Sequence, residues 1–278
     1  MEKQGDHQRT LYVLLDFSDY ASAELRLAKS WAESKGLEVK VLHQPDFFAP
    51  SMATKQQRLR LEYEQIREIN HRWLRLKDEI FGPETSPGFE IVKTSLDKYL
   101  ESELTKMPGI IIMGLKGGGK LKQIFLGSMV TELVEKLNAY ITAVPKTLTV
   151  FEPKELVVSV SPHYTFNYDG FATFLPLLPS SIKITHWISV VENPEDEKVL
   201  LQHLKLLSEK IKSHMENKFT VFCGEEVFEK VKTFISSEKG QFLVVQKGGR
   251  TFKDKLFRRF LINDLVYDGS VPLVIIPA

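Results

Sequence analysis

Short apolar runs alternate with amphipathic stretches along the first part of the chain. Residues 11–15 form an apolar run typical of a buried strand, and residues 37–42 alternate apolar and polar side chains, as a second strand does. The stretch between them has the spacing of a helix, which Ser18 can cap and which Gly36 ends in the left-handed conformation. Strand, helix and strand within about 30 residues predict a βαβ unit. The apolar positions of this helix are Leu25, Ala28, Trp31 and Ala32.

The rest of the first half follows the same alternation. Residues 53–80 are polar, basic and free of glycine and proline, so they predict a long helix with a thin apolar stripe. A strand is expected at 89–93, and the run 109–113 predicts a strand buried on both faces, as central parallel strands are. A helix with apolar residues at helical spacing follows at 130–137, and residues 140–144 form the last strand.

The same order of elements starts again near residue 155, and two strands repeat in detail. The buried strand 109–113 corresponds to 241–245, and the last strand 140–144 corresponds to 272–276. In each half, 26 residues lie between the buried strand and the last strand. We therefore predict an internal duplication, with domains at 1–148 and 153–278 and a linker near 146–153. Strands alternating with helices imply mainly parallel sheets with helices on both faces. Further strands are expected at 156–160, 183–191 and 219–222, and further helices at 170–178, 199–211, 227–235 and 256–267.

Composition excludes several partners. The 37 lysine and arginine residues nearly balance 36 aspartate and glutamate residues, so the charge favours neither nucleic acid nor a membrane surface. Cys223 is the only cysteine, which excludes an intrachain disulfide and suits a reducing compartment. No apolar stretch approaches the roughly 20 residues that span a bilayer, and the polar N-terminus lacks a signal-peptide pattern. We expect a soluble, cytoplasmic protein without a metal site, because its histidines lack zinc-site spacing.

A glycine-rich loop carries the candidate chemistry. Gly114, Gly117, Gly118 and Gly119 follow the buried strand directly, and Gly127 and Ser128 then open a helix. Glycine lets the backbone approach a ligand with its N–H groups exposed, and a helix N-terminus favours negative charge. Ligands of open α/β sheets also bind beyond the carboxyl ends of the strands. The loop therefore predicts a binding site for a phosphate-bearing ligand.

Two better-known glycine motifs do not fit this loop. Residues 114–121 follow the P-loop pattern except at Leu121, where the hydroxyl that would hold Mg²⁺ is absent. The dinucleotide fingerprint of three spaced glycines also fails. A plain flexible turn between strand and helix is the alternative interpretation, because glycine loops are common connectors.

The spacing of this loop resembles the nucleotide-binding signature of the universal stress proteins, G-x2-G-x9-G-[ST]. Here Gly114, Gly117, Gly127 and Ser128 fill it without an insertion. The first strand, followed by Asp16, Phe17 and Ser18, is similar to the first strand of that family with its adenine-facing aspartate. The paired layout resembles the tandem members. The resemblance implies two Rossmann-like (adenine nucleotide alpha hydrolase-like) domains, each with a five-stranded, mainly parallel sheet, whose last strands pair across a pseudo-twofold axis.

The resemblance also implies a nucleotide site with named residues. Asp16 accepts a hydrogen bond from the adenine edge, although a helix-capping carboxylate is the alternative for this residue. The backbone around Gln44 flanks the base. The ligand is ATP, with ADP or AMP not separated from it, and Mg²⁺ could accompany the nucleotide. The ribose is lined by Met113 and Gly114, the phosphates are held by Gly117, Gly127, Ser128 and Met129, and Lys116, Lys120 and Lys122 add positive charge.

The second half carries a degenerate copy of the loop. Gln246, Gly249, Arg259 and Phe260 stand where the first half has its signature residues, and Ser161 takes the place of Asp16. Large side chains fill positions where a phosphate needs bare backbone, so we predict no nucleotide there. The basic cluster 247–259 is either a solvated helix face or a site for an anion or a partner.

Three functions remain to be separated. The first is an ATP-binding stress-response regulator or sensor with one nucleotide per chain. The second is a slow ATPase or autophosphorylating enzyme in which Ser128 is the nearest hydroxyl, although the sequence offers no clear general base. The third is a nucleotide-free interaction protein that uses the basic face of the second half. Whether chains pair, and with which protein partner, stays open.

Overall fold

The first half contains five strands and four helices in the part of the chain that the structure describes. This computed structural model describes residues 9–47, 50–115, 128–162, 164–191, 193–211, 213–237, 240–247 and 271–278. The elements are β1 (Thr10–Leu14), α1 (Ala21–Lys35), β2 (Glu38–His43), α2 (Lys55–Ile80), β3 (Gly88–Ile91), α3 (Leu96–Lys106), β4 (Gly109–Gly114), α4 (Ser128–Lys136) and β5 (Tyr140–Val144).

The second half repeats this order from residue 155, close to the predicted start of the second domain. The predicted helix at 256–267 lies outside the described residues. The elements are β6 (Glu155–Ser159), α5 (Tyr168–Phe174), η1 (Leu175–Leu177), β7 (Ile184–Val191), η2 (Pro194–Asp196), α6 (Glu197–Lys210), β8 (Glu216–Cys223), α7 (Val227–Ser237), β9 (Gln241–Gln246) and β10 (Leu273–Ile276).

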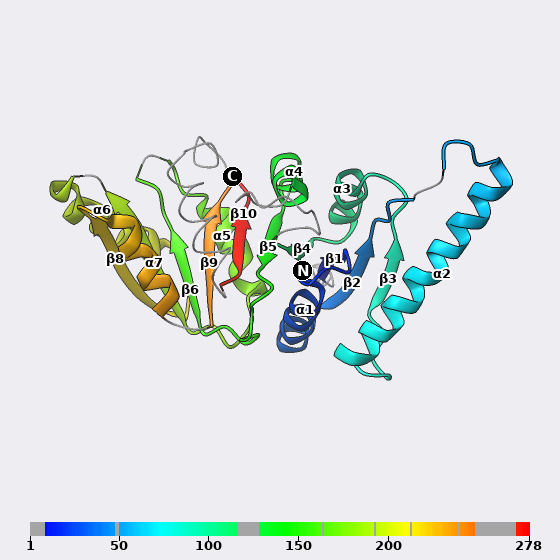
Figure 1. Cartoon of the computed structure of the whole chain (residues 1–278). Coiled ribbons are helices and arrows are strands. Elements are labelled where there is room, and N and C mark those ends of the chain that lie inside the picture. The colour runs from blue at the N-terminus through cyan, green and yellow to red at the C-terminus, as the bar shows by residue number, and fades with distance from the viewer. Residues whose placement is uncertain are drawn as a thin grey trace, which may run out of the picture.

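The described strands form one ten-stranded sheet in the order β3-β2-β1-β4-β5-β10-β9-β6-β7-β8 (Figure 1). Every neighbouring pair within each half is parallel. The fold is therefore α/β with a mainly parallel sheet, as the alternation of strands and helices predicts. The apolar run 109–113 supplies a strand that is buried along its whole length, as expected for a strand paired on both sides.

The two halves meet through their last strands. β5 and β10 pair antiparallel, with Thr142 opposite Val274, so the expected pairing of these strands is confirmed. Each strand covers an edge that the other half would otherwise leave unpaired. The contact continues beneath the sheet, where the fully buried Trp31 donates a hydrogen bond from Nε1 to the carbonyl oxygen of Leu177 at 2.6 Å. Trp31 also packs against Phe242, with 5.4 Å between the ring centroids.

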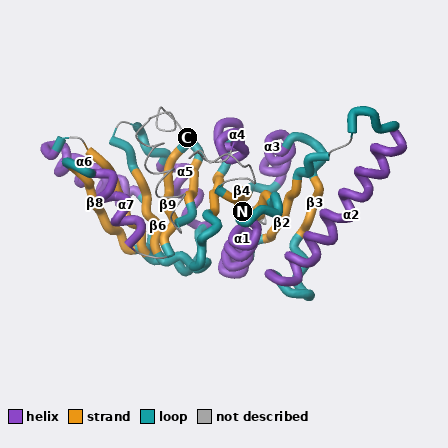
Figure 2. Tube along the Cα trace, viewed as in Figure 1, coloured by secondary structure: helices purple, strands orange, loops and turns teal. Residues whose placement is uncertain are grey.

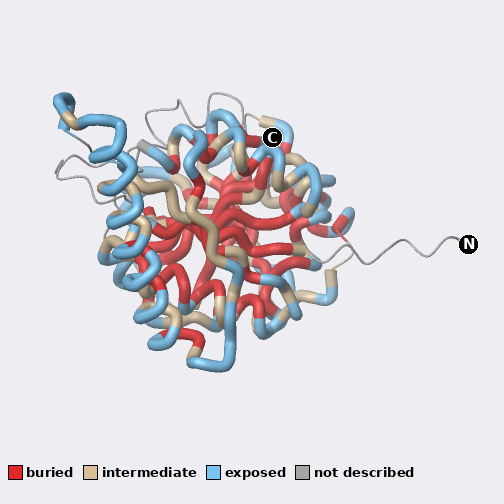
Figure 3. Tube along the Cα trace, turned by 90° about the vertical axis from the view of Figure 1, so that its right-hand side faces the viewer, coloured by how far each residue is buried: buried red, intermediate tan, exposed pale blue. Residues whose placement is uncertain are grey.

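Helices cover both faces of the sheet. One core cluster joins the strands to α1, α2 and α5, and the other joins them to α3, α4 and α7. Figure 2 shows α3 and α4 on one side of the first-half strands and α1 on the other. Figure 3 shows the continuous buried interior within exposed outer helix faces. Among the described helices, none is long and apolar enough to cross a membrane.

The start of α1 differs from the sequence-based expectation. Ser18 is not the cap, because the helix begins at Ala21 and its N-cap residue is Tyr20, which makes no side-chain capping bond. The Ser18 hydroxyl instead accepts a hydrogen bond from the Tyr20 backbone N–H at 3.3 Å, outside the helix. The other end is as predicted, since Gly36 ends the helix with φ of 66°.

The long helix α2 is only thinly anchored to the body of the molecule. It has 26 residues, of which Ile69, Trp73 and Ile80 are buried. Thr54 begins it with a capping box, since the Thr54 side chain accepts from the Gln57 N–H and the Gln57 side chain accepts from the Thr54 N–H. The helix has a thin apolar stripe, but its members differ from the predicted Leu59, Ile66, Ile69 and Leu76. Only Ile69 of these is buried, and Leu59 is 58% exposed. Most of the remaining surface of the helix is exposed.

Candidate functional site

The strand order places a candidate site at the carboxyl ends of β1 and β4. These strands are neighbours, and the chain continues from β1 to β2 on one side and from β4 to β5 on the other. Such a point of reversal opens a crevice above an α/β sheet, and ligands of this architecture bind there. Asp16, Gln44 and Gly114 follow or end β1, β2 and β4, and the registers bring these strand ends to the same edge.

Asp16 is exposed at this edge and organises the turn after β1. Its Oδ1 accepts a hydrogen bond from the Ser18 backbone N–H at 2.9 Å. The alternative role as a helix-capping carboxylate is not supported, because α1 starts only at Ala21. The carboxylate therefore stabilises its own loop while remaining accessible to solvent.

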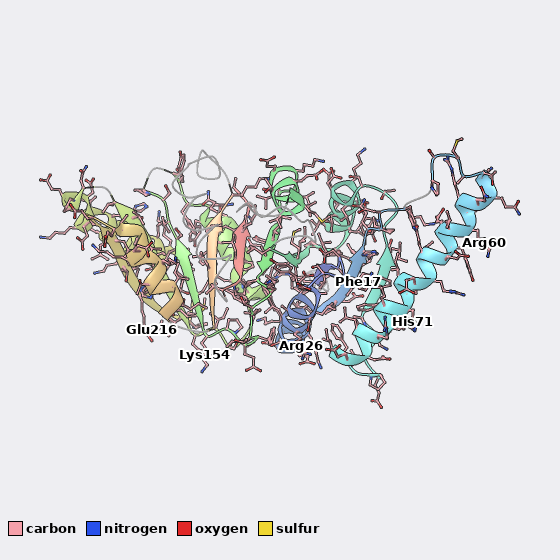
Figure 4. All side chains as sticks on the ribbon, in the orientation of Figure 1. Phe17, Arg26, Arg60, His71, Lys154 and Glu216 are labelled. Atoms are coloured by element: carbon pink, nitrogen blue, oxygen red, sulfur yellow. The ribbon has the colours of Figure 1, made fainter. Side chains whose placement is uncertain are left out.

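Phe17 has an uncommon backbone conformation, and its ring contacts one aromatic side chain and one cation. Its φ of 56° lies in the left-handed region, which non-glycine residues rarely adopt. Its ring meets the His43 ring edge-on at a centroid distance of 4.9 Å. The guanidinium of Arg72, from α2, lies 4.5 Å from the ring centroid and donates to the Phe17 carbonyl oxygen at 3.3 Å. Figure 4 shows Phe17 on the side of the sheet along which α2 runs.

The pKa of His43, next to this cluster, is lowered. Burial lowers the pKa of its imidazole, and the nearby charge of Arg72 lowers it further, although a hydrogen bond to the Leu15 carbonyl opposes both. That hydrogen bond joins His43 Nδ1 to the Leu15 oxygen at 2.7 Å, so Nδ1 carries the proton. The pair ties the end of β2 to the end of β1, next to Asp16.

Gln44 has a structural role in addition to its predicted one. Its side-chain Nε2 donates a hydrogen bond to the Thr94 carbonyl oxygen at 2.6 Å. This bond links the end of β2 to the loop after β3. The side chain is therefore engaged, which leaves the backbone at Gln44 as the part that can flank a base.

Gly114 is a glycine because no side chain fits at this position. A Cβ atom there would lie 2.5 Å from Glu24 Oε1 and 2.8 Å from Tyr20 Cβ. The Gly114 N–H also donates a hydrogen bond to the Glu24 carboxyl group. The glycine thus has a local packing reason, independent of any ligand. Met113, the other residue expected to line the ribose, is only 3% exposed and packs in the core, so its side chain is not placed at the surface of the site.

The phosphate side of the predicted site is described only in part. α4 begins at Ser128, and Met129 in its first turn is 38% exposed. The helix N-terminus and its partial positive charge therefore lie next to the segment that follows β4. Gly117 and Gly127, together with Lys116, Lys120 and Lys122, lie outside the described residues.

The corresponding strand end of the second half carries a hydrogen-bonded side chain. Gln246, at the end of β9, accepts a hydrogen bond from the Asn167 N–H at 2.6 Å and donates one to the Thr165 carbonyl oxygen at 3.1 Å. The amide group thus ties the end of β9 to the loop after β6. Gly249, Arg259 and Phe260 lie outside the described residues.

One member of the basic cluster has a defined structural partner. Lys247 Nζ donates hydrogen bonds to the carbonyl oxygens of Glu135 and Leu137, at 3.2 and 2.8 Å. These carbonyls lie at the carboxyl end of α4, where a cation is favourable. Lys247 therefore joins the second half to the helix that follows the glycine loop. The other members of the cluster lie outside the described residues.

Sequence reasoning missed Glu24 and Arg72 as residues of this region. Glu24 could have been found, because it precedes Ala28 by four residues and Trp31 by seven and so lies on the buried face of α1. No comparable signal marks Arg72, whose role depends on how α2 packs. Within the described residues, no group of three or more histidine, cysteine, aspartate or glutamate side chains is placed to hold a metal ion.

Solved structures with the same architecture include a universal stress protein from Archaeoglobus fulgidus DSM 4304. It matches with a TM-score of 0.65 and 13% sequence identity, over 97% of this chain and 98% of that one. The chain has the fold of a universal stress protein. A functionally unknown protein from Pseudomonas aeruginosa PAO1 matches with a TM-score of 0.51 and 12% identity, over 97% of this chain and 92% of that one. No protein-family model matches the chain, and a search of curated proteins gives no match.

The universal stress fold confirms the architecture implied by the glycine spacing. The match extends over both halves, so it includes the degenerate copy as well as the copy with the intact signature. Among the described site residues, Asp16 and Gly114 lie at the carboxyl ends of the neighbouring strands β1 and β4, where the strand order of the first half reverses.

Proposed function

We propose that this chain is a tandem universal stress protein that binds one adenine nucleotide in its first half. Binding converts the protein between two functional states, so that it acts as a nucleotide-dependent regulator or sensor of stress. The observation that carries the proposal is the switch-point crevice, which has an exposed Asp16 on one wall and the glycine loop beginning at Gly114 on the other. The single cysteine fits a reducing compartment, and we place the protein in the cytoplasm.

The charge distribution around the crevice supports a nucleotide in one orientation. Asp16 and Glu24 supply carboxyl groups on the β1 and α1 side. The segment from Gly114 to Ser128 contains lysines and no acidic residue, and it leads into the N-terminus of α4. A ligand with hydrogen-bond donors at one end and phosphates at the other matches this polarity, and ATP has both.

The contrast between the two halves supports a single site. Gly114 adds no side chain at the end of β4, whereas Gln246 at the end of β9 carries an amide group that is hydrogen-bonded on both sides. A ligand in the second half would have to displace these bonds, and the sequence there has Arg259 and Phe260 in place of Gly127 and Ser128. One nucleotide per chain follows.

Calorimetric titration of the folded full-length chain with ATP, ADP and AMP tests the proposal. We expect about one site per chain for at least one of the three nucleotides. Gly127→Arg, which copies the second-half residue Arg259, should weaken binding by about tenfold or more, because it places a large side chain where the backbone meets phosphate.

A matched control keeps this test specific. Asp169→Asn changes an exposed acidic residue in the second half and should leave the affinity unchanged. Circular dichroism should show that both variants are folded. A folded wild-type chain that binds none of the three nucleotides at millimolar concentration would contradict the proposal.

A further inference from the structure

Glu24 is a buried carboxyl group next to the end of β4. It lies in the first turn of α1 and is 1% exposed. Its Oε1 lies 2.5 Å from the point where a Cβ atom of residue 114 would be, so the missing side chain of Gly114 leaves room for it. The sequence thus places an acidic residue on the apolar face of α1 and a glycine at the end of β4. A carboxyl group therefore fits between these two elements.

One oxygen of this carboxyl group has no hydrogen-bond partner among the described residues. The Gly114 N–H donates to the group, but Oε2 is buried and unpaired. Leaving such an atom unpaired costs about 1–3 kcal/mol, and native proteins therefore provide a partner for nearly all of them. The second half shows the usual solution, since Glu155 is also buried and has His186 and Gln241 as hydrogen-bond partners, one for each oxygen.

The surroundings of Glu24 indicate which kind of chemical group can pair with Oε2. Burial raises the pKa of the carboxyl group well above its ordinary value, and the charge of Asp16 raises it further. A phosphate next to these two acids would be repelled, and the described residues offer no third ligand for a metal ion. A hydroxyl group fits best, because it can both donate and accept and so pairs with either protonation state of the acid.

We propose that Glu24 is a further ligand-binding residue of the first-half crevice and pairs through Oε2 with a sugar hydroxyl of the bound ribonucleotide. This inference rests on the proposed function. It makes Glu24 the residue that distinguishes ribose from deoxyribose, since an analogue without the hydroxyl leaves the buried oxygen unpaired. Sites that hydrogen-bond a ligand hydroxyl reject the analogue that lacks it much more strongly than apolar pockets do.

Affinities for ATP, 2′-deoxy-ATP and 3′-deoxy-ATP, measured by calorimetry on the full chain at neutral pH, test the inference. We expect the wild type to bind ATP about tenfold more tightly than the analogue that lacks the contacted hydroxyl. Glu24→Leu should reduce that ratio to about one, whereas Glu24→Gln, which keeps a donor and an acceptor, should retain most of it. Glu33→Gln changes an exposed carboxylate of the same helix, 68% exposed, and should leave all affinities unchanged.

The outcomes separate this inference from the proposed function. Wild-type protein that binds ATP but does not discriminate between the three ligands overturns the inference alone. The same holds if Glu24→Leu keeps the wild-type ratio, as expected if a buried water molecule pairs with Oε2. If circular dichroism shows that Glu24→Leu is unfolded, Glu24→Ala, which only removes atoms, takes its place in the comparison. Wild-type protein that binds no nucleotide overturns both proposals.

Discussion

Two equivalent strands of this molecule end in different residues. Gly114 ends β4 in the first half, and Gln246 ends β9 in the second. The glycine adds no side chain at this strand end, while the glutamine amide bridges the Asn167 N–H and the Thr165 carbonyl oxygen. A repeated fold can therefore keep its frame while the contacts at a strand end change.

The buried carboxyl groups of the two halves show the same contrast. Glu155, in the second half, has hydrogen-bond partners for both oxygens, and His186 in turn contacts Thr220 Oγ1 at 2.8 Å. Glu24, in the first half, has one oxygen unpaired among the described residues. Gln241 Oε1, next to Glu155, is itself without a partner among the described residues, so the contrast between the halves concerns these two carboxyl groups alone.

The largest expected effect is on the free energy of unfolding, and it tests whether the two halves unfold as one unit. Trp31→Ala removes a fully buried indole that packs against Phe242 and donates to the Leu177 carbonyl oxygen, both in the second half. We expect the free energy of unfolding to fall by about 3–5 kcal/mol. Chemical denaturation followed by circular dichroism should show a single, earlier transition. Two separate transitions in the wild type would show that the halves fold independently.

Placing the second-half residue in the first half should close the first crevice. Gly114→Gln introduces a Cβ atom that would lie 2.5 Å from Glu24 Oε1 and 2.8 Å from Tyr20 Cβ. We expect a loss of about 1–3 kcal/mol in the free energy of unfolding and no measurable nucleotide binding. Thermal melting and calorimetry provide the two readouts. A variant that keeps wild-type stability and affinity would mean that bare backbone at residue 114 is unimportant.

The reverse change should have a smaller effect. Gln246→Gly removes two hydrogen bonds to the loop after β6 and should lower the free energy of unfolding by about 1–2 kcal/mol. It should not create a second nucleotide site, because Arg259 and Phe260 remain. The stoichiometry of ATP binding measured by calorimetry checks this, and a rise to two sites would reduce the difference between the halves to a single residue.

The smallest effect concerns pH, and the two buried carboxyl groups should act in opposite directions. Burial raises the pKa of Glu24, so its contribution to stability is present at low pH and is lost as the pH rises through the folded-state value. The hydrogen bond with His186 lowers the pKa of Glu155, so its contribution is present above the ordinary carboxyl range and is lost as the pH falls.

Denaturation curves between pH 3 and pH 9 measure these contributions. Glu24→Gln should flatten the decline in stability toward high pH, and Glu155→Gln should flatten the decline toward low pH. Each change should alter the slope by at most about 1.4 kcal/mol per pH unit, the value for one proton. If both substitutions flatten the same side of the profile, the assignment of these two groups is wrong.

Much of the fold could be predicted from the sequence, because it depends on periodicity. The buried run 109–113, the alternating run 37–42 and their repetition in the second half indicate parallel strands linked by helices, and the structure has them in that order. Boundaries were less accurate. β8 extends over Glu216–Cys223 rather than 219–222, since its first residues are exposed on an edge strand and have no apolar pattern.

The candidate site was predictable only where a residue type implies a backbone property. Gly114 and Asp16 stand at strand ends and could be placed from the chain alone. The left-handed Phe17 could not, because nothing in a phenylalanine signals positive φ, and its conformation depends on contacts with His43 and Arg72. For the second half, the large residues Arg259 and Phe260 led us to predict a blocked site. In the described residues, the side chain at this strand end is instead the polar Gln246, which makes specific hydrogen bonds.

The antiparallel pairing of β5 with β10 has an evolutionary consequence. In an assembly of two identical subunits joined in this way, any substitution would appear twice, once at each symmetric position. Covalent fusion removes that constraint, so that a substitution in one half leaves the other half unchanged. The pairing of β5 with β10 within one chain thus allows the two halves to differ in sequence while their strands keep a symmetric arrangement.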